Sequence, residues 1–213
     1  MPPHRSHRLI GAACILVLAA LSCIWVGRHY RQQNLNRALI AAIKKSDASK
    51  VDDLLAAGAD ANTRDTPAKQ RSFRDIIHDL FRPPIDVSDT ALFDAAYNKA
   101  PHIVKALIAS GADVNANTKD GFTPLMVAAD NGDIESVNAL IKAHADVDAR
   151  DNEGATALIV IADTYAFDNS ACTRALISAG ADVNAKNNYG ESALARAELG
   201  EIIDILKAAG GKE

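Results

Sequence analysis

DGFTPLMVAADNG, residues 120–132 of the 213-residue chain, contains a turn, a helix start and a short helix in succession. Thr123-Pro124 is typical of a helix N-terminus, because a Thr side chain caps exposed backbone N–H groups and Pro fits the first turn. Ala128-Ala129 allows a neighbouring helix to approach closely. The stretch therefore predicts a short helix that begins after Thr123 and packs through small side chains.

Two motifs from this pattern recur in step along the chain. The helix start returns at offsets of 33, 33 and 36 residues, at Thr90-Ala91-Leu92, Thr123-Pro124-Leu125, Thr156-Ala157-Leu158 and Ser192-Ala193-Leu194. The second motif is Gly-Ala-Asp at 58–60, 111–113 and 180–182, and His-Ala-Asp at 144–146. We expect Gly58, Gly111 and Gly180 to end a second helix in each unit, where a positive φ is required. A fixed period of this length indicates a repeat protein.

The period of 33 residues with these two motifs closely resembles the ankyrin repeat. The resemblance implies an all-α solenoid of about five helix-turn-helix repeats, in which each unit buries its apolar face only by stacking on its neighbours. The expected units are 34–65, 87–119, 120–152, 153–187 and 188–213, with the first and last as caps and residues 66–86 as an insert. Met126 stands where the family usually has His, which predicts the loss of a hydrogen-bond partner for Thr123.

The chain before the repeats has the pattern of an export or membrane signal. A basic tail at 1–8 is followed by Leu9–Val26, which runs for 18 residues without a charge. As a helix this run is about 27 Å long, just short of a hydrocarbon core of about 30 Å. We expect residues 9–27 to form one transmembrane or signal-anchor helix, 28–33 a juxtamembrane linker and 34–213 the repeat domain.

Two other interpretations of this segment stay open. Ala19-Ala20-Leu21-Ser22-Cys23 resembles a loose bacterial lipobox, which would make Cys23 a lipidation site, although such boxes usually prefer Leu at the position of Ala20. A plainly cleaved signal is the third interpretation. The expected location is a bacterial inner membrane, with a single pass and the repeat domain in the periplasm, and the lipoprotein anchored at Cys23 is the alternative.

Charge is unevenly distributed along the chain. Four arginines and no acidic residue lie in the first 31 residues, whereas residues 32–213 hold 19 basic against 27 acidic groups, a formal charge of −8. An acidic body argues against a nucleic-acid partner, because phosphates need a basic surface. It favours a protein partner with a basic or neutral surface.

The repeat pattern is interrupted between the first two units. Within the insert 66–86, apolar residues follow the spacing of one face of a helix. These residues are Phe73, Ile76, Ile77, Leu80 and Phe81. Two interpretations remain: the face packs on the first repeats and extends the core, or it contacts a partner protein.

Further candidate binding residues come from the expected groove. The segment Asp163–Ser170 is about three residues longer than in the other units and contains Tyr165 and Phe167. Alignment of the units places Lys44, Tyr97, Asp130 and Asp163 in one column of the first helices, and Phe122 at a tip between repeats. In ankyrin-repeat proteins this surface contacts partners. We therefore expect Tyr97, Phe122, Asp130, Asp163, Tyr165 and Phe167 to join the insert in binding.

Signals for chemistry are absent from the sequence. We find no Gly-rich phosphate loop, no His-Glu-x-x-His and no Cys-x-x-Cys motif, and the six histidines are scattered. The sequence thus predicts no catalytic residue, no metal and no cofactor. The resemblance implies protein–protein interaction. The most concrete form of this expectation is a bacterial envelope protein that inhibits or assists one partner at the membrane. The alternatives are a general scaffold with several weak partners and, less favoured, a hydrolytic enzyme.

Overall fold

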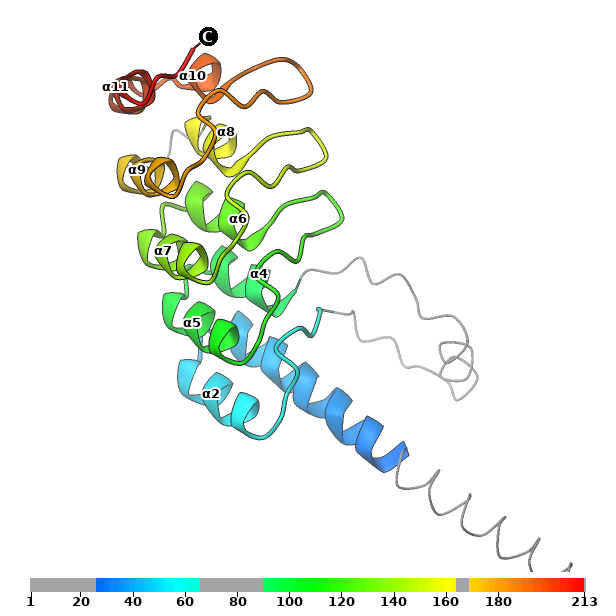
Figure 1. Ribbon diagram of the computed structural model, residues 1–213. Helices are drawn as coiled ribbons and strands as arrows, with labels where there is room; N and C mark the ends of the chain where they lie inside the picture. Colours follow the sequence, from blue (N-terminus) through cyan, green and yellow to red (C-terminus); the bar gives the residue numbers. More distant parts are fainter. Residues whose placement is uncertain (1–25, 66–89, 164–168, 213) are drawn as a thin grey trace, which may run out of the picture.

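A computed structural model describes residues 26–65, 90–163 and 169–212. These residues form helices connected by turns and loops, without strands, in pairs that stack along one axis (Figure 1). The first helix of the stack covers residues 26–44 and pairs with α2 (Ala48–Ala56). The later pairs are α4 (Ala91–Tyr97) with α5 (Pro101–Ala109), α6 (Pro124–Asp130) with α7 (Ile134–Lys142), α8 (Ala157–Ala162) with α9 (Ser170–Ser178), and α10 (Ala193–Arg196) with α11 (Gly200–Ala208). The expected all-helical repeat architecture is confirmed.

The helices form two layers with loops along one side. Helices α4, α6, α8 and α10 make an inner layer, while α2, α5, α7, α9 and α11 make an outer layer (Figure 1). Adjacent inner helices contact one another, as do adjacent outer helices. The alanine pairs at 95–96 and 128–129 are fully buried, which allows the close approach that the sequence predicts. Leu107, Leu140 and Leu176 fill the outer layer and are also fully buried.

Threonine and serine begin most of the inner helices. Thr90 Oγ1 accepts from Phe93 N at 3.2 Å, and Thr123 Oγ1 accepts from Met126 N at 3.3 Å. The prediction that Met126 removes a hydrogen-bond partner for Thr123 is wrong, because Thr123 N donates to the Met126 sulfur at 3.4 Å. The thioether is a weak acceptor, and this contact completes a capping box with Thr123. Thr156 differs: its hydroxyl is buried and caps no N–H group.

A polar ladder connects each turn after an outer helix to the next. The side chains of Asp60, Asp113, Asp146 and Asp182 each accept from the N–H two residues later, at 2.9–3.1 Å. The residue two positions after the aspartate then accepts from a backbone N–H of the following unit. Asn62 Oδ1 accepts from Asp113 N at 2.6 Å, and Asn115 Oδ1 accepts from Asp146 N at 2.8 Å. The Gly-Ala-Asp motif therefore sets both the turn and its spacing to the next repeat.

The first helix is longer than the sequence predicts. Residues 26–44 are continuously helical, so the expected linker at 28–33 is part of this helix. Gln32 Nε2 donates to Gly58 O at 2.8 Å, and Asn36 Oδ1 accepts from Asp60 N at 2.9 Å, which ties the helix to the turn after α2. In the described part of the chain, no helix is both long and apolar enough to cross a membrane. The expected anchor at 9–27, apart from its last two residues, and Cys23 lie outside that part.

Candidate functional site

The ends of the inner helices bring together part of the predicted binding surface. Tyr97 is the last residue of α4, Asp130 is the last residue of α6, and Asp163 caps α8. Because these helices are neighbours in the stack, the three residues lie at the same end of consecutive inner helices. Asn131 Nδ2 donates to Tyr97 O at 3.1 Å and links the ends of α4 and α6. We call Tyr97, Asp130 and Asp163 the helix-end surface.

Tyr97 is the most exposed apolar group of this surface. Its side chain is 64% exposed, although its ring stacks on Phe93, with centroids 6.5 Å apart and planes inclined by 15°. Phe93 is itself packed against the core. The ring of Tyr97 is thus presented to solvent from a fixed support. An aromatic side chain held in this way loses little entropy when it binds, which is a property of binding hot spots.

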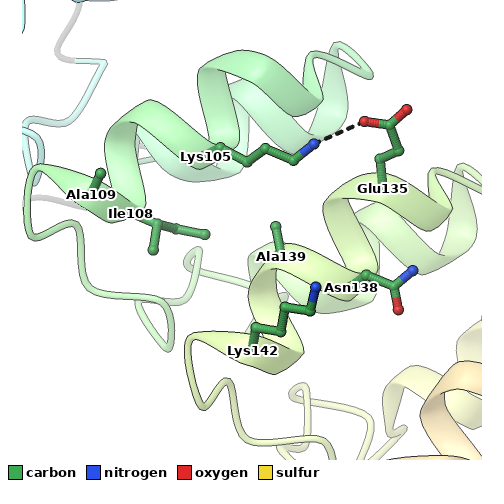
Figure 2. A pocket seen from close by; sticks show the side chains of 7 residues that line it. All are labelled: Lys105, Ile108, Ala109, Glu135, Asn138, Ala139 and Lys142. Atoms are coloured by element: carbon green, nitrogen blue, oxygen red, sulfur yellow. Dashed lines mark hydrogen bonds and ion pairs between the residues drawn. The ribbon is translucent and has the colours of Figure 1, made fainter.

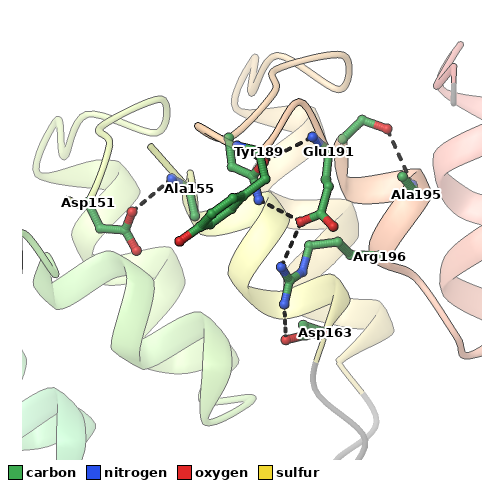
Figure 3. Close-up of polar contacts among 9 residues, drawn as sticks. Asp151, Ala155, Asp163, Tyr189, Glu191, Ala195 and Arg196 are labelled. Carbon is green, nitrogen blue, oxygen red and sulfur yellow. Dashed lines mark hydrogen bonds and ion pairs between the residues drawn. The ribbon is translucent and has the colours of Figure 1, made fainter. Parts of the chain in front are cut away.

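Asp163 holds an arginine of the next unit. Its carboxylate accepts from Arg196 Nη2 at 2.5 Å, and Arg196 Nη1 donates to Glu191 at 2.9 Å (Figure 3). The pKa of Arg196 is raised, first by the hydrogen bond to Asp163 and then by the bond to Glu191. A hydrogen bond from Asn187, followed by the one from Arg196, lowers the pKa of Glu191. Asp163 therefore presents a paired charge to a partner.

Sequence reasoning missed Arg196 and Glu191. A signal was present, because Arg196 lies four residues after the helix-start residue Ser192, where the two preceding units have Val127 and Val160. An arginine where those two units have valine needs a carboxylate nearby, and the carboxylates come from Asp163 and Glu191.

Phe122 lies apart from the helix-end surface. It precedes the N-cap of α6, so the seven-residue helix separates it from Asp130 by about 10 Å. Its side chain is half-buried and packs against the core. The fold therefore places Phe122 in the loops that connect each outer helix to the next inner helix, which we call the hairpins. Among these loops Tyr189, 69% exposed, is the more accessible aromatic ring.

The hairpin tips are locked to one another. Asn152 Nδ2 donates to Lys119 O at 3.0 Å, and Asn188 Nδ2 donates to Asn152 O at 3.1 Å. Arg150 donates to Gly154 O at 2.9 Å and to Lys186 O at 2.7 Å. These side chains are used within the stack, and they stiffen the loops that border the inner helices.

The described residues on either side of the insert are joined at one place in the stack. Arg64 and Thr90 form an isolated antiparallel bridge, and Ala91 N donates to Thr63 O at 2.9 Å. Lys44 pairs with Asp65, the last described residue before the insert. The chain thus leaves and re-enters at the hairpin before α4. The predicted binding residues of the insert (Phe73, Ile76, Ile77 and Phe81) and of the later loop (Tyr165 and Phe167) lie outside the described residues.

An open depression lies on the opposite, outer layer, between α5 and α7 (Figure 2). Its volume is 590 Å³, and it is lined by Lys105, Ile108, Ala109, Glu135, Asn138, Ala139 and Lys142. Lys105 Nζ donates to Glu135 at 2.9 Å, and this hydrogen bond, with the charge of Lys105, lowers the pKa of Glu135. None of the predicted binding residues lines this depression.

The described residues offer no metal site. No three His, Cys, Asp or Glu side chains among residues 26–65, 90–163 and 169–212 are close enough together to hold an ion. Cys172, in α9, is a buried cysteine with a reduced thiol.

Comparison with known families gives one match. The family model for ankyrin repeats, in three copies, matches residues 68–151 and 125–210. Together the two matches cover residues 68–210, which is more than half of the chain. The match indicates no catalytic family. A search of curated proteins finds no match to this chain.

Proposed function

This chain belongs to the ankyrin-repeat family, and on that premise we propose that it binds one protein partner through the helix-end surface and the adjoining hairpins. The observation that carries the proposal is Tyr97, 64% exposed and stacked on a ring that packs against the core. Hot spots of protein interfaces are enriched in such aromatic side chains. The binding is of the kind by which a partner is inhibited or assisted, without chemistry by the repeat protein.

The negative charge of the helix-end surface favours a particular kind of partner surface. Asp130 lies beside Tyr97 at the helix ends, and residues 32–213 carry a formal charge of −8. A cationic side chain of the partner over the Tyr97 ring gains both a cation–π contact and the attraction of the nearby carboxylate. The partner therefore has a basic or neutral surface, and nucleic acid is not a partner.

The N-terminal segment supports a location of this binding at a membrane. The uncharged run Leu9–Val26 between arginines supports an anchor at 9–27, with the repeat domain in the bacterial periplasm. The lipoprotein alternative, with Cys23 as the lipidated residue, makes a different prediction. Globomycin, which blocks lipoprotein signal cleavage, leaves an anchored chain unchanged and causes a lipoprotein precursor to accumulate.

The binding proposal is tested by affinity capture with the full chain from a detergent extract of the parent cell. We expect one abundant partner, lost with Tyr97→Ala and retained with Tyr30→Ala. Tyr30 is a matched control because it is also 64% exposed but lies on the first helix, away from the helix-end surface. Equal capture by both variants would contradict the proposal. Several weak partners, each tolerant of Tyr97→Ala, would favour the scaffold alternative.

The role of the insert is tested separately. Because residues 65 and 90 adjoin the same hairpin, removal of 66–86 shortens a loop without removing a described helix. We expect the triple variant Phe73→Ser, Ile77→Ser, Phe81→Ser to lose the partner while the repeats still melt cooperatively. Loss of cooperative melting would instead assign the apolar face to the core.

A further inference from the structure

The first helix extends past the body of the repeat stack. Residues 32–44 of this helix contact the turn after α2 and the core, through Gln32, Asn36 and Leu39 among others. Every residue from 26 to 31 is exposed, and Figure 1 shows this end of the helix projecting beyond α2. The projecting end therefore has a surface that no described repeat covers.

The first helix, residues 26–44, carries basic residues and no acidic residue. Arg28, Arg31 and Arg37 are exposed, and none of them forms an ion pair with the described part of the chain. The first acidic residue of the sequence is Asp47, beyond the end of the helix. The positive charge is thus concentrated at one end of a molecule whose remainder is acidic.

Two exposed apolar side chains lie among these arginines. Tyr30 is 64% exposed and Val26 is 53% exposed. They are four residues apart, so they lie on the same side of the helix. Tyrosine beside arginine is the combination found where a protein meets the lipid headgroup layer, since the ring is amphipathic and the guanidinium binds phosphate.

We propose that residues 26–37 bind the headgroups of anionic phospholipids. At a rise of about 1.5 Å per residue, Arg28 and Arg31 are about 4.5 Å apart along the axis, within one headgroup layer of roughly 5–7 Å. Arg37 lies about 9 Å beyond Arg31 along the axis, outside that layer but within about one Debye length of 8–10 Å.

The positions of the arginines around the helix set its orientation. At about 100° per residue, Arg28 and Arg37 lie on opposite sides of the helix. A helix that lies flat on a membrane carries its basic residues on one face, whereas this arrangement suits a helix that stands through the headgroups. The acidic repeat stack is then repelled from the anionic surface and faces away from it. Duplex nucleic acid is the less favoured ligand, because contact with its phosphates would not remove the exposed apolar side chain of Val26 from water.

The test measures binding of residues 26–213 to vesicles of phosphatidylcholine with and without phosphatidylglycerol. This fragment keeps the described core, in which the buried apolar residues run from Leu39 to Leu206, and it lacks the apolar run that would insert on its own. We expect cosedimentation with anionic vesicles only. Arg28→Gln, Arg31→Gln, Arg37→Gln together reduce binding on the order of 25-fold or more, since each basic residue near the surface contributes about fivefold.

The control removes the same number of positive charges from the repeat stack. Lys50→Gln, Lys119→Gln, Lys207→Gln changes three exposed lysines and is expected to leave vesicle binding within about twofold, since these residues lie away from the bilayer. At high salt, where the charges of the arginines are screened, Tyr30→Ala is expected to weaken the remaining vesicle binding, whereas Tyr97→Ala is not. Equal losses in the arginine and lysine variants, or binding to duplex DNA with no binding to anionic vesicles, would overturn the proposal. All variants are first required to melt cooperatively, and Arg31→Gln alone replaces the triple variant if the latter does not.

Discussion

At the scale of single residues, His144 adopts a left-handed backbone conformation at a position where three other repeat units have glycine. Gly58, Gly111 and Gly180 follow their outer helices with φ of 92°, 84° and 95°. His144 takes the same place after α7 with φ of 63°. A left-handed conformation costs an L-residue roughly 1–2 kcal/mol, because Cβ approaches a carbonyl oxygen.

His144→Gly is therefore expected to stabilise the protein by about 0.5–1 kcal/mol, the strain relieved being partly offset by the greater entropy of glycine in the unfolded chain. Urea denaturation at constant pH measures the change. Gly111→Ala is the reverse control, and it is expected to destabilise through φ alone, since no atom lies within 4 Å of the added Cβ. A destabilised His144→Gly variant would show that the imidazole contributes more than the strain.

At the scale of elements, the hairpins are rigid because each one packs against the next. A Cβ on Gly121 would lie 2.7 Å from Asn152 N, and one on Gly154 would lie 2.4 Å from Asn188 Oδ1. Gly190 lies at the equivalent tip of the last hairpin, where a Cβ would meet nothing within 4 Å. All three have positive φ. The chain thus contains the same turn with and without a neighbouring hairpin.

Gly121→Ala is expected to cost more than Gly190→Ala. The second substitution introduces only conformational strain, about 1 kcal/mol, while the first adds overpacking of about 1–3 kcal/mol against the backbone of the next tip. Chemical denaturation of both variants measures the difference. If the two costs are equal, the hairpin tips do not transmit packing between units.

The contact between the last two units also predicts a pH dependence. The pKa of Glu191 is lowered from 4.5 by Asn187 and Arg196, so its charged form is favoured in the folded state. Its contribution to stability is complete above that value and is lost as the pH falls through the lower, folded pKa. Glu191→Gln should therefore show a smaller loss of melting temperature between about pH 5 and pH 3 than the parent chain. If the variant and the parent chain lose the same melting temperature over this pH range, the bonds to Asn187 and Arg196 are absent in solution.

At the scale of the whole molecule, stability is distributed along a line. The inner helices α6 and α8 each contact the inner helices on either side, whereas the main contacts of α11 within the described residues are with α9 and α10, at one end of the stack. In such a stack, stability is approximately the sum of the unit terms and the interfaces between neighbours. The same substitution should therefore have different consequences in the middle and at the end.

Leu140 and Leu206 are both fully buried, in α7 and α11 respectively. Leu140→Ala is expected to cost about 2–5 kcal/mol and to reduce hydrogen-exchange protection in the units on both sides. Leu206→Ala should reduce protection mainly within residues 188–212. Hydrogen exchange with mass spectrometry distinguishes the two patterns. Uniform loss of protection in the Leu206→Ala chain would show that the stack unfolds as one unit.

Local pattern was sufficient to predict much of the fold. The period, the helix starts at Thr90 and Thr123, and the glycines at positive φ all depend on interactions within a few residues, so the sequence alone determined the helix pairs and their turns. The same argument predicted that Tyr97, Asp130 and Asp163 share one column. It could not predict that Asp163 holds Arg196, because that pairing depends on the distance between neighbouring units.

Only the tertiary structure decided which polar side chains bind other parts of the repeat stack and which remain exposed to a partner. Asn152 and Arg150 bind neighbouring hairpins, and Asp163 is paired, whereas Tyr97 remains exposed on its aromatic support. It also decided that the first helix begins by residue 26 and projects beyond the repeats. The physical reason is common to these cases: a repeat pattern specifies what each unit presents, and only the stacking of units specifies which of those groups meet one another and which meet solvent.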